Sequence, residues 1–110
     1  MALKFVRKER VRMISIKKIK QIITEVLENN TGKVSISLNH DLQDDLLISK
    51  DDYKEIASDL QDAFRERESC GFDLDDYDQW NIVADICNDV IDSIEEEGYI
   101  IYQNLEIEDV

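Results

Sequence analysis

The chain has 110 residues, 43% of them hydrophobic and 35% charged, with a formal net charge of −13 at pH 7. This length and composition predict one globular domain with a modest core rather than a disordered chain. The acidity disfavours binding to nucleic acid or to membranes rich in anionic lipid, and no apolar run approaches the roughly 20 residues that cross a bilayer. Because no signal-peptide pattern is present either, we expect a cytoplasmic protein.

The charge is divided unevenly along the chain. Residues 1–20 hold eight basic side chains and one acid, a sum of +7, whereas residues 21–110 hold five basic side chains and 25 acids, a sum of −20. We therefore expect a basic N-terminal extension over residues 1–14, a helical domain over 15–97 and a C-terminal tail over 98–110. The acidic body predicts a basic protein as partner.

The first helix is expected to follow Ser15, a suitable N-cap, and to end near Asn29 and Asn30, before Gly32. Its apolar residues recur at helical spacing, and they are Ile16, Ile19, Ile22, Ile23, Val26 and Leu27. Residues 33–38 alternate between polar and apolar, which on period alone indicates a strand. We prefer an extended loop held against the core, because a single short strand would have no partner.

The second helix is expected from about Lys50 to Arg67, with an apolar stripe and acidic remaining faces. A loop follows, then a short turn of helix within residues 72–78. A last helix fits Ile82 to Glu97, with Asn81 as its N-cap and Gly98 just past its end. Residues 99–102 have strand-like composition, so the tail is free to pack on the body, to pair with a partner's sheet edge or to pair with residues 3–6.

The sequence holds no convincing catalytic or metal-binding motif. Cys70 and Cys87 are expected to be unpaired in a cytosolic chain, and a single histidine, His40, leaves too few ligands for a zinc site. The run of aspartates from Asp73 lacks the glycine and the glutamate that an EF-hand loop needs. We therefore expect a protein that is not an enzyme, with no metal and no cofactor.

The segment from Asp45 to Phe64, DLLISKDDYKEIASDLQDAF, resembles the central motif of acyl carrier proteins. In that family Asp-Leu-Gly-x-Asp-Ser-Leu opens a helix that ends about four turns later in a Phe, and the serine carries phosphopantetheine. The Asp-Leu falls on Asp45 and Leu46, and the closing Phe on Phe64. Residues 80–87 are similar to the segment that opens the family's last helix. The resemblance implies an all-α, acyl-carrier-protein-like four-helix bundle.

Two departures remove the chemistry that this resemblance would imply. The family's glycine is replaced by Leu47 and its serine by Lys50, while Ser49 lies one position early. Ser49 ahead of Asp51 and Asp52 is better explained as a helix N-cap than as a phosphopantetheine attachment site. The segment is closest to an uncharacterised bacterial branch of acyl-carrier-like proteins that lacks the serine.

The acids of the second helix and of the loop after it predict a contact surface for a basic partner, with nearby aromatic residues as anchors. The candidate partner-binding residues are Asp51, Asp52, Tyr53, Glu55, Asp59, Asp62, Asp73, Asp75, Asp76, Tyr77, Asp78 and Trp80.

Three functions compete at this point. The first is a non-enzymatic, carrier-like protein that presents its second helix to a basic enzyme or other protein. The second is an immunity protein that neutralises a cationic, nuclease-type bacterial toxin through charge and shape. The third is a genuine acyl carrier modified with phosphopantetheine at Ser49. The sequence does not name the partner or the oligomeric state.

Overall fold

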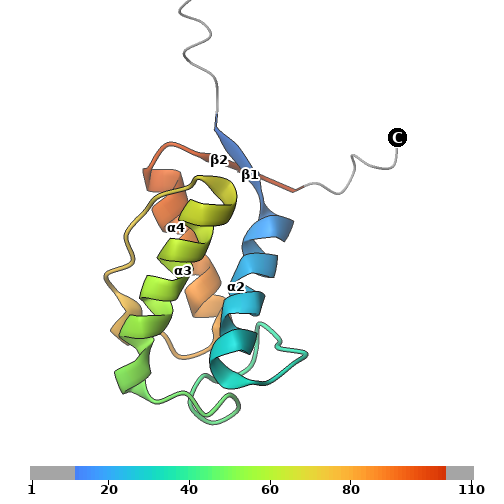
Figure 1. The fold of residues 1–110 in the computed structure, drawn as a ribbon, viewed down its shortest axis with the longest axis vertical. Coiled ribbons are helices and arrows are strands. Elements are labelled where there is room, and N and C mark those ends of the chain that lie inside the picture. Colours follow the sequence, from blue (N-terminus) through green and yellow to red (C-terminus); the bar gives the residue numbers. More distant parts are fainter. Residues whose placement is uncertain (1–11, 104–110) are drawn as a thin grey trace, which may run out of the picture.

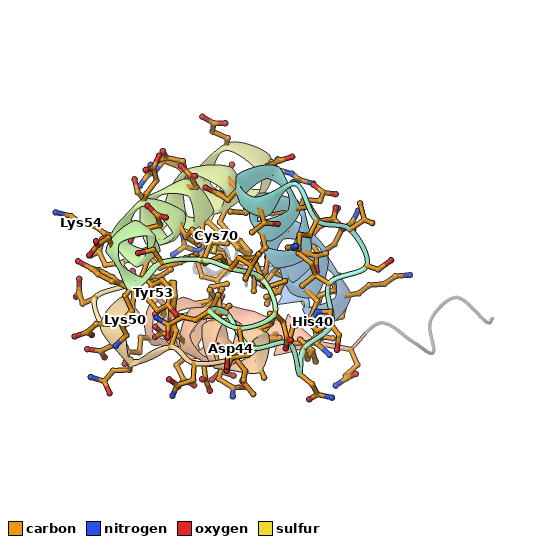
Figure 2. All side chains as sticks on the ribbon, turned by 90° about the horizontal axis from the view of Figure 1, so that it is seen from below. His40, Asp44, Lys50, Tyr53, Lys54 and Cys70 are labelled. Carbon is orange, nitrogen blue, oxygen red and sulfur yellow. The ribbon has the colours of Figure 1, made fainter. Side chains whose placement is uncertain are left out.

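The structure is a computed structural model, and it describes residues 12–103 of the chain (Figure 1). Three α-helices enclose a common interior, as the view along the molecule in Figure 2 also shows, and two short strands lie at one end. The elements in chain order are β1 (Met13–Ser15), α2 (Ile16–Thr31), the 3-10 turn η1 (Lys50–Asp52), α3 (Tyr53–Glu68), the 3-10 turn η2 (Tyr77–Gln79), α4 (Val83–Glu96) and β2 (Ile100–Tyr102).

The expected all-α four-helix bundle is wrong. The described residues form three α-helices and a two-stranded parallel sheet. The short third helix is reduced to the 3-10 turn η2, because residues 72–78 hold four aspartates, which have low helix propensity and repel one another.

The second departure from an all-helical fold is the pairing of β1 with β2. Met13 lies opposite Ile100 and Ser15 opposite Tyr102, so β1 takes residues that we had divided between the N-terminal extension and the helical domain. The pairing with residues 3–6 that we considered for the tail involves residues outside the described range. Ile14 is buried beneath the sheet, while Met13, Ile100 and Tyr102 face outward.

Polar contacts hold the sheet against the end of α3. The Arg12 guanidinium donates to the Tyr99 hydroxyl at 3.2 Å and lies over the Tyr99 ring. The same hydroxyl donates to the backbone carbonyl of Ser69, the residue that ends α3, at 3.0 Å. The two strands are therefore fixed to the helices by side chains as well as to each other.

The first helix follows the sequence prediction. The Ser15 hydroxyl accepts from the backbone N–H of Lys18 at 3.0 Å, and Gly32 ends the helix at a φ of 76°, where glycine carries no steric penalty. All of its predicted apolar residues except the half-buried Ile16 are buried.

The segment after α2 is a loop, as preferred, and residues 33–38 form no strand in the structure described here. Leu42, Leu46 and Ile48 bury their side chains, and an isolated bridge between Asp41 and Ile82 ties the loop to the start of α4. The loop therefore closes the end of the helices opposite to the sheet (Figure 1).

The last helix has a different N-cap from the expected one. Ile82, not Asn81, precedes the first helical residue, and the Asp85 carboxylate accepts from the backbone N–H groups of both residues at 3.0 and 2.8 Å. The acid three residues into the helix thus satisfies the donors that an Asn cap was expected to serve.

The core draws on every helix and on the loops between them. Phe64 and Phe72 meet edge to face with ring centroids 5.3 Å apart, and Cys70 and Cys87 are buried and unpaired. Within residues 12–103, no helix is long and apolar enough to cross a membrane. The apolar interior is the main source of stability.

We predict that Leu60→Ala lowers the free energy of unfolding by about 2–5 kcal/mol, because it opens a cavity where Leu60 is now fully enclosed. The control is Leu47→Ala, a shortening of the same side chain at an exposed position, which should change stability by less than about 0.5 kcal/mol. Urea unfolding followed by tryptophan fluorescence measures both. Equal losses in the two variants would show that Leu60 is not part of a packed core.

Candidate functional site

One side of α3 carries a row of acids. Glu55, Asp59, Asp62 and Glu66 follow the spacing i, i+4, i+7 and i+11, which places them on a single helix face. The buried stripe fixes the rotation of this face, since Ile56, Leu60 and the other core residues of α3 point inward. Glu66 was missing from our candidate surface, although its spacing from Asp62 would have revealed it.

The acidic row borders α2, and the two helices enclose two shallow hollows between them. The first, of about 390 Å³, lies between the end of α2, the loop at Leu46–Ile48, and Asp52 and Glu55. The second, of about 250 Å³, lies between Val26 to Asn30 and the side chains of Asp59, Asp62 and Glu66. Asn30 lines both hollows. We call this continuous surface, formed by Asn30, Asp52, Glu55, Asp59, Asp62 and Glu66, the acidic groove.

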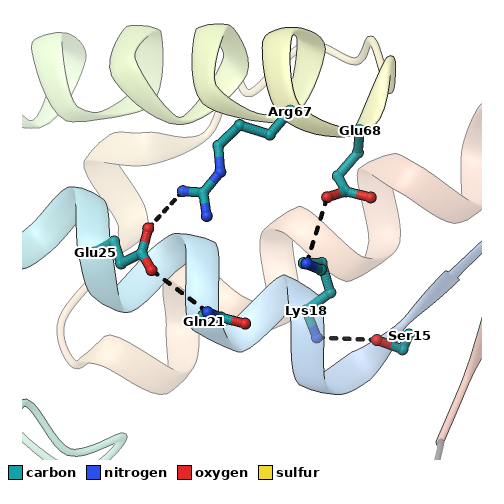
Figure 3. A network of polar contacts seen from close by, with 6 residues as sticks. All are labelled: Ser15, Lys18, Gln21, Glu25, Arg67 and Glu68. Atoms are coloured by element: carbon teal, nitrogen blue, oxygen red, sulfur yellow. Dashed lines mark hydrogen bonds and ion pairs between the residues drawn. The ribbon is translucent and has the colours of Figure 1, made fainter.

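Asn30 joins the two helices across the acidic groove. Its side-chain amide donates to the Asp59 carboxylate at 3.2 Å and to the backbone carbonyl of Val26 at 2.9 Å. Further along, Arg67 of α3 reaches Glu25 of α2, and Lys18 of α2 lies 3.9 Å from Glu68 of α3 (Figure 3). The hydrogen bond from Arg67 lowers the pKa of Glu25. These contacts align the two walls of the groove.

Within residues 12–103, most carboxylates of the acidic groove are not in ion pairs. Among the described residues, Asp62 is the one groove acid in an ion pair, with Arg65 at 3.1 Å. Both partners are largely exposed, so the pair contributes at most about 1 kcal/mol. Lys33 is the one basic side chain that lines either hollow within residues 12–103. The groove therefore offers several carboxylates to an incoming cationic group.

The acids of the loop after α3 belong to a different surface. Gln61 accepts from the backbone N–H of Leu74 at 2.8 Å, which holds this loop on another side of α3 from the acidic groove. Asp76 lines a hollow of about 280 Å³ with Asp85, Asp89 and Asp92 of α4. We call these four residues the α4 acidic surface. The single surface expected from the sequence is thus divided in two, and Asp73, Asp75 and Asp78 lie exposed on the loop beside the second part.

Two of the three expected aromatic anchors are not available at the surface. Tyr53 is 1% exposed and Trp80 is 2% exposed, with ring centroids 5.9 Å apart. Tyr77 is half-buried and packs edge to face on Trp80. Tyr53 is not an exposed anchor because its side chain continues the buried apolar stripe of α3. Trp80 is not an exposed anchor because it packs inside the fold, where the Asp89 carboxylate accepts its indole N–H at 2.9 Å.

The start of α3 is formed by the residues that replace the carrier motif. The exposed Ser49 hydroxyl accepts from the backbone N–H of Asp51 at 3.1 Å, which confirms the predicted capping role. Lys50 donates to the backbone carbonyl of Asp78 at 3.1 Å, near the outward-pointing Lys54 (Figure 2). Asp51 and Asp52 lie exposed in the first turn, where the helix dipole favours acids.

Leu47, at the position of the carrier motif's glycine, has a φ of 57° and is 72% exposed. This left-handed conformation is one that leucine rarely adopts. The sequence shows that leucine replaces the glycine, but it gives no sign that the Leu47 side chain is exposed. A bulky apolar side chain therefore stands at the rim of the first hollow.

The described residues offer little for catalysis. His40 accepts the backbone N–H of Ser37 at 2.9 Å within its own loop, and no group of three or more His, Cys, Asp or Glu side chains in residues 12–103 is placed to hold a metal ion. The thiols of Cys70 and Cys87 are buried, and burial raises the pKa of Cys87 to about 11.

Comparisons of this chain with protein-family models, with curated proteins and with solved structures find no match. The resemblance to acyl carrier proteins therefore rests on the sequence motifs at residues 45–64 and 80–87.

Among the described residues, Asp89 is the carboxyl whose pKa is raised by the fold. Partial burial raises its pKa, repulsion from Asp76, Asp92 and Asp75 adds to the increase, and the hydrogen bond from Trp80 opposes it. A carboxyl with a raised pKa in the folded state binds its proton more tightly there than in the unfolded chain. Its contribution to stability is therefore greatest at low pH and is lost as the pH rises through the folded pKa.

We predict that Asp89→Asn stabilises the protein more at about pH 7 than at about pH 3.5, below the usual aspartate pKa, because Asn retains an acceptor for Trp80 but carries no charge. Trp80 is the one tryptophan of the chain, so its fluorescence during urea unfolding reports the difference. Asp44→Asn, at an exposed aspartate that is not among the acids acting on the pKa of Asp89, is the control for lost charge. The same pH dependence in both variants would contradict a specific role for Asp89.

Proposed function

We propose that this is a non-enzymatic acidic protein that binds a basic protein partner through the acidic groove. The observation that carries the proposal is the row of carboxylates from Asp52 to Glu66, which borders two hollows and is largely without counter-charges among the described residues. Carboxylates on one side of a helix attract a cationic surface, raise the rate of encounter and orient the partner.

The energetic cost of these acids to the fold supports the proposal. Glu55 and Asp59, and Asp62 and Glu66, are like-charged pairs at i, i+4, each of which destabilises a helix by about 0.2–0.5 kcal/mol. If α3 needed only a soluble surface, side chains of alternating positive and negative charge at these positions would make the helix more stable. A cationic partner turns the same repulsion into a favourable contribution to binding.

The motif at Asp45–Phe64 gives independent support. In acyl carrier proteins, which this segment resembles, the helix that follows the motif docks on partner enzymes, and that use does not require the serine. The equivalent helix here is α3, which carries the acidic groove. Ser49 is occupied as a cap, which supports a docking function over the carrier alternative with phosphopantetheine at Ser49.

An immunity protein that neutralises a cationic, nuclease-type toxin is the second candidate. The observation that favours it is the α4 acidic surface, because a second group of acids, apart from those on α3, exceeds what a single docking helix uses. A toxin encoded beside this chain, and protection by co-expression, would support this candidate over an enzyme partner.

The test begins by placing a photo-crosslinking benzoylphenylalanine at position 55, in the acidic groove, and at position 75, on the loop, in the cells that produce the protein. We predict that position 55 captures a basic protein and that position 75 does not. Both sites are exposed, so accessibility does not separate them.

The captured protein is then purified and its affinity measured by calorimetry. Glu55→Gln with Asp59→Asn and Glu66→Gln should weaken binding by about tenfold or more, or about 1.4 kcal/mol, and remove most of its salt dependence. The control removes three charges from the loop, with Asp73→Asn, Asp75→Asn and Asp78→Asn. Equal losses in both triple variants would show that net charge, and not the acidic groove, drives binding.

A further inference from the structure

An apolar side chain stands exposed beside the acidic groove. It belongs to Leu47, which is 72% exposed. Leu47 lines the first hollow together with Lys33, and the buried residues Ile48 and Ile56 form part of its apolar lining. This end of the groove therefore combines an apolar lining and rim with the carboxylates of Asp52 and Glu55.

The backbone at Leu47 is held in place by its neighbours. Asp45 and Leu46 both donate their N–H groups to the carbonyl of Asp41, at 3.0 and 3.1 Å, and Ile48 donates to the carbonyl of Leu42 at 2.9 Å. The positive φ of Leu47 is a consequence of this tight turn, and glycine would adopt it without steric cost. Because so little of the Leu47 side chain is buried, packing within the described fold does not explain a leucine here. Backbone strain of this kind is more frequent at binding and active sites than elsewhere.

We infer that the acidic groove binds a basic, amphipathic α-helix of the partner, with Leu47 contacting its apolar face. This inference rests on the proposed function and adds the chemistry and shape of the docking segment. The lysine or arginine side chains of that helix lie against the acids from Asp52 to Glu66, and an apolar side chain enters the first hollow.

The dimensions of the groove favour a helix over an extended strand. From Asp52 to Glu66 the groove runs along α3 for about 21 Å, the length of a helix of about 14 residues. A strand would instead need an open sheet edge, and the sheet of the described residues lies at the end of the molecule opposite to the first hollow (Figure 1). A helix lying in a groove between two helices is an established mode of recognition, with apolar anchors at i, i+3, i+4 and i+7.

The test uses the full-length protein and two synthetic helical peptides of about 14 residues with equal numbers of lysines. One has leucines at i, i+3, i+4 and i+7, and in the other those leucines are replaced by alanine. We expect the wild type to bind the leucine peptide about tenfold more tightly than the alanine peptide, since one or more leucines become buried. Leu47→Gly should remove most of this preference and leave the affinity for the alanine peptide unchanged.

Ser35→Gly is the matched control, because Ser35 is also exposed and has a φ of 60°. It relaxes a left-handed residue in the same way but removes no apolar group, so it should keep the preference for the leucine peptide. Leu47→Ser, which keeps a side chain at position 47, guards against a change caused by the flexibility of glycine. Thermal unfolding shows that each variant is folded before binding is measured.

The outcomes separate this inference from the proposed function. The inference is overturned if Leu47→Gly and Leu47→Ser bind the leucine peptide as tightly as the wild type does, or if Ser35→Gly loses as much affinity as they do. If the variant with Glu55→Gln, Asp59→Asn and Glu66→Gln still loses affinity for both peptides in that case, the proposed function stands. If that triple variant binds both peptides like the wild type, the acidic groove is not the binding surface and both proposals fail.

Discussion

The burial of one stripe of α3 sets the arrangement on which the rest of the molecule depends. Tyr53, Ile56, Leu60 and Phe64 point into the core, and each large apolar side chain contributes about 1.5–3 kcal/mol when buried. The repulsion between acids on the outer face amounts to about 0.2–0.5 kcal/mol per pair, so packing decides how the helix is rotated. The carboxylates are consequently held beside α2, where they form the acidic groove. The position of the proposed binding surface is therefore a consequence of core packing.

The loops and chain ends keep the helices in this position. At one end, Asp41 accepts the backbone N–H groups that form the turn at Leu47. At the other, Tyr99 links Arg12 to the last residues of α3. Since the acidic groove lies between α2 and α3, the contacts at both ends help to hold these helices at a fixed separation. The exposed Leu47 belongs to the turn at the first of these ends. The same turn therefore leads into α3 and exposes an apolar side chain.

The sequence predicts the parts of this structure that depend on local rules. Helical spacing and the caps at Ser15, Gly32 and Ser49 locate α2 and the start of α3. The sequence does not predict contacts between residues that lie far apart along the chain. The pairing of Met13 with Ile100, the burial of Trp80 against Asp89 and the separation of the loop acids from the acidic groove are all tertiary choices. The sequence indicated solvated acidic faces, but it did not indicate that Asp59, Asp85 and Asp89 are half-buried or that the acids lie on two surfaces.

The most direct measurement of the central claim is a map of amide chemical shifts of the isotope-labelled protein during titration with its basic partner, at low and at high salt. The account predicts that the shifts concentrate on α3 from Asp52 to Glu66, on Asn30 and on Leu47, and that they diminish as salt screens the carboxylates. Shifts concentrated on Asp76, Asp85 and Asp92 of the α4 acidic surface, or on the sheet, would contradict it.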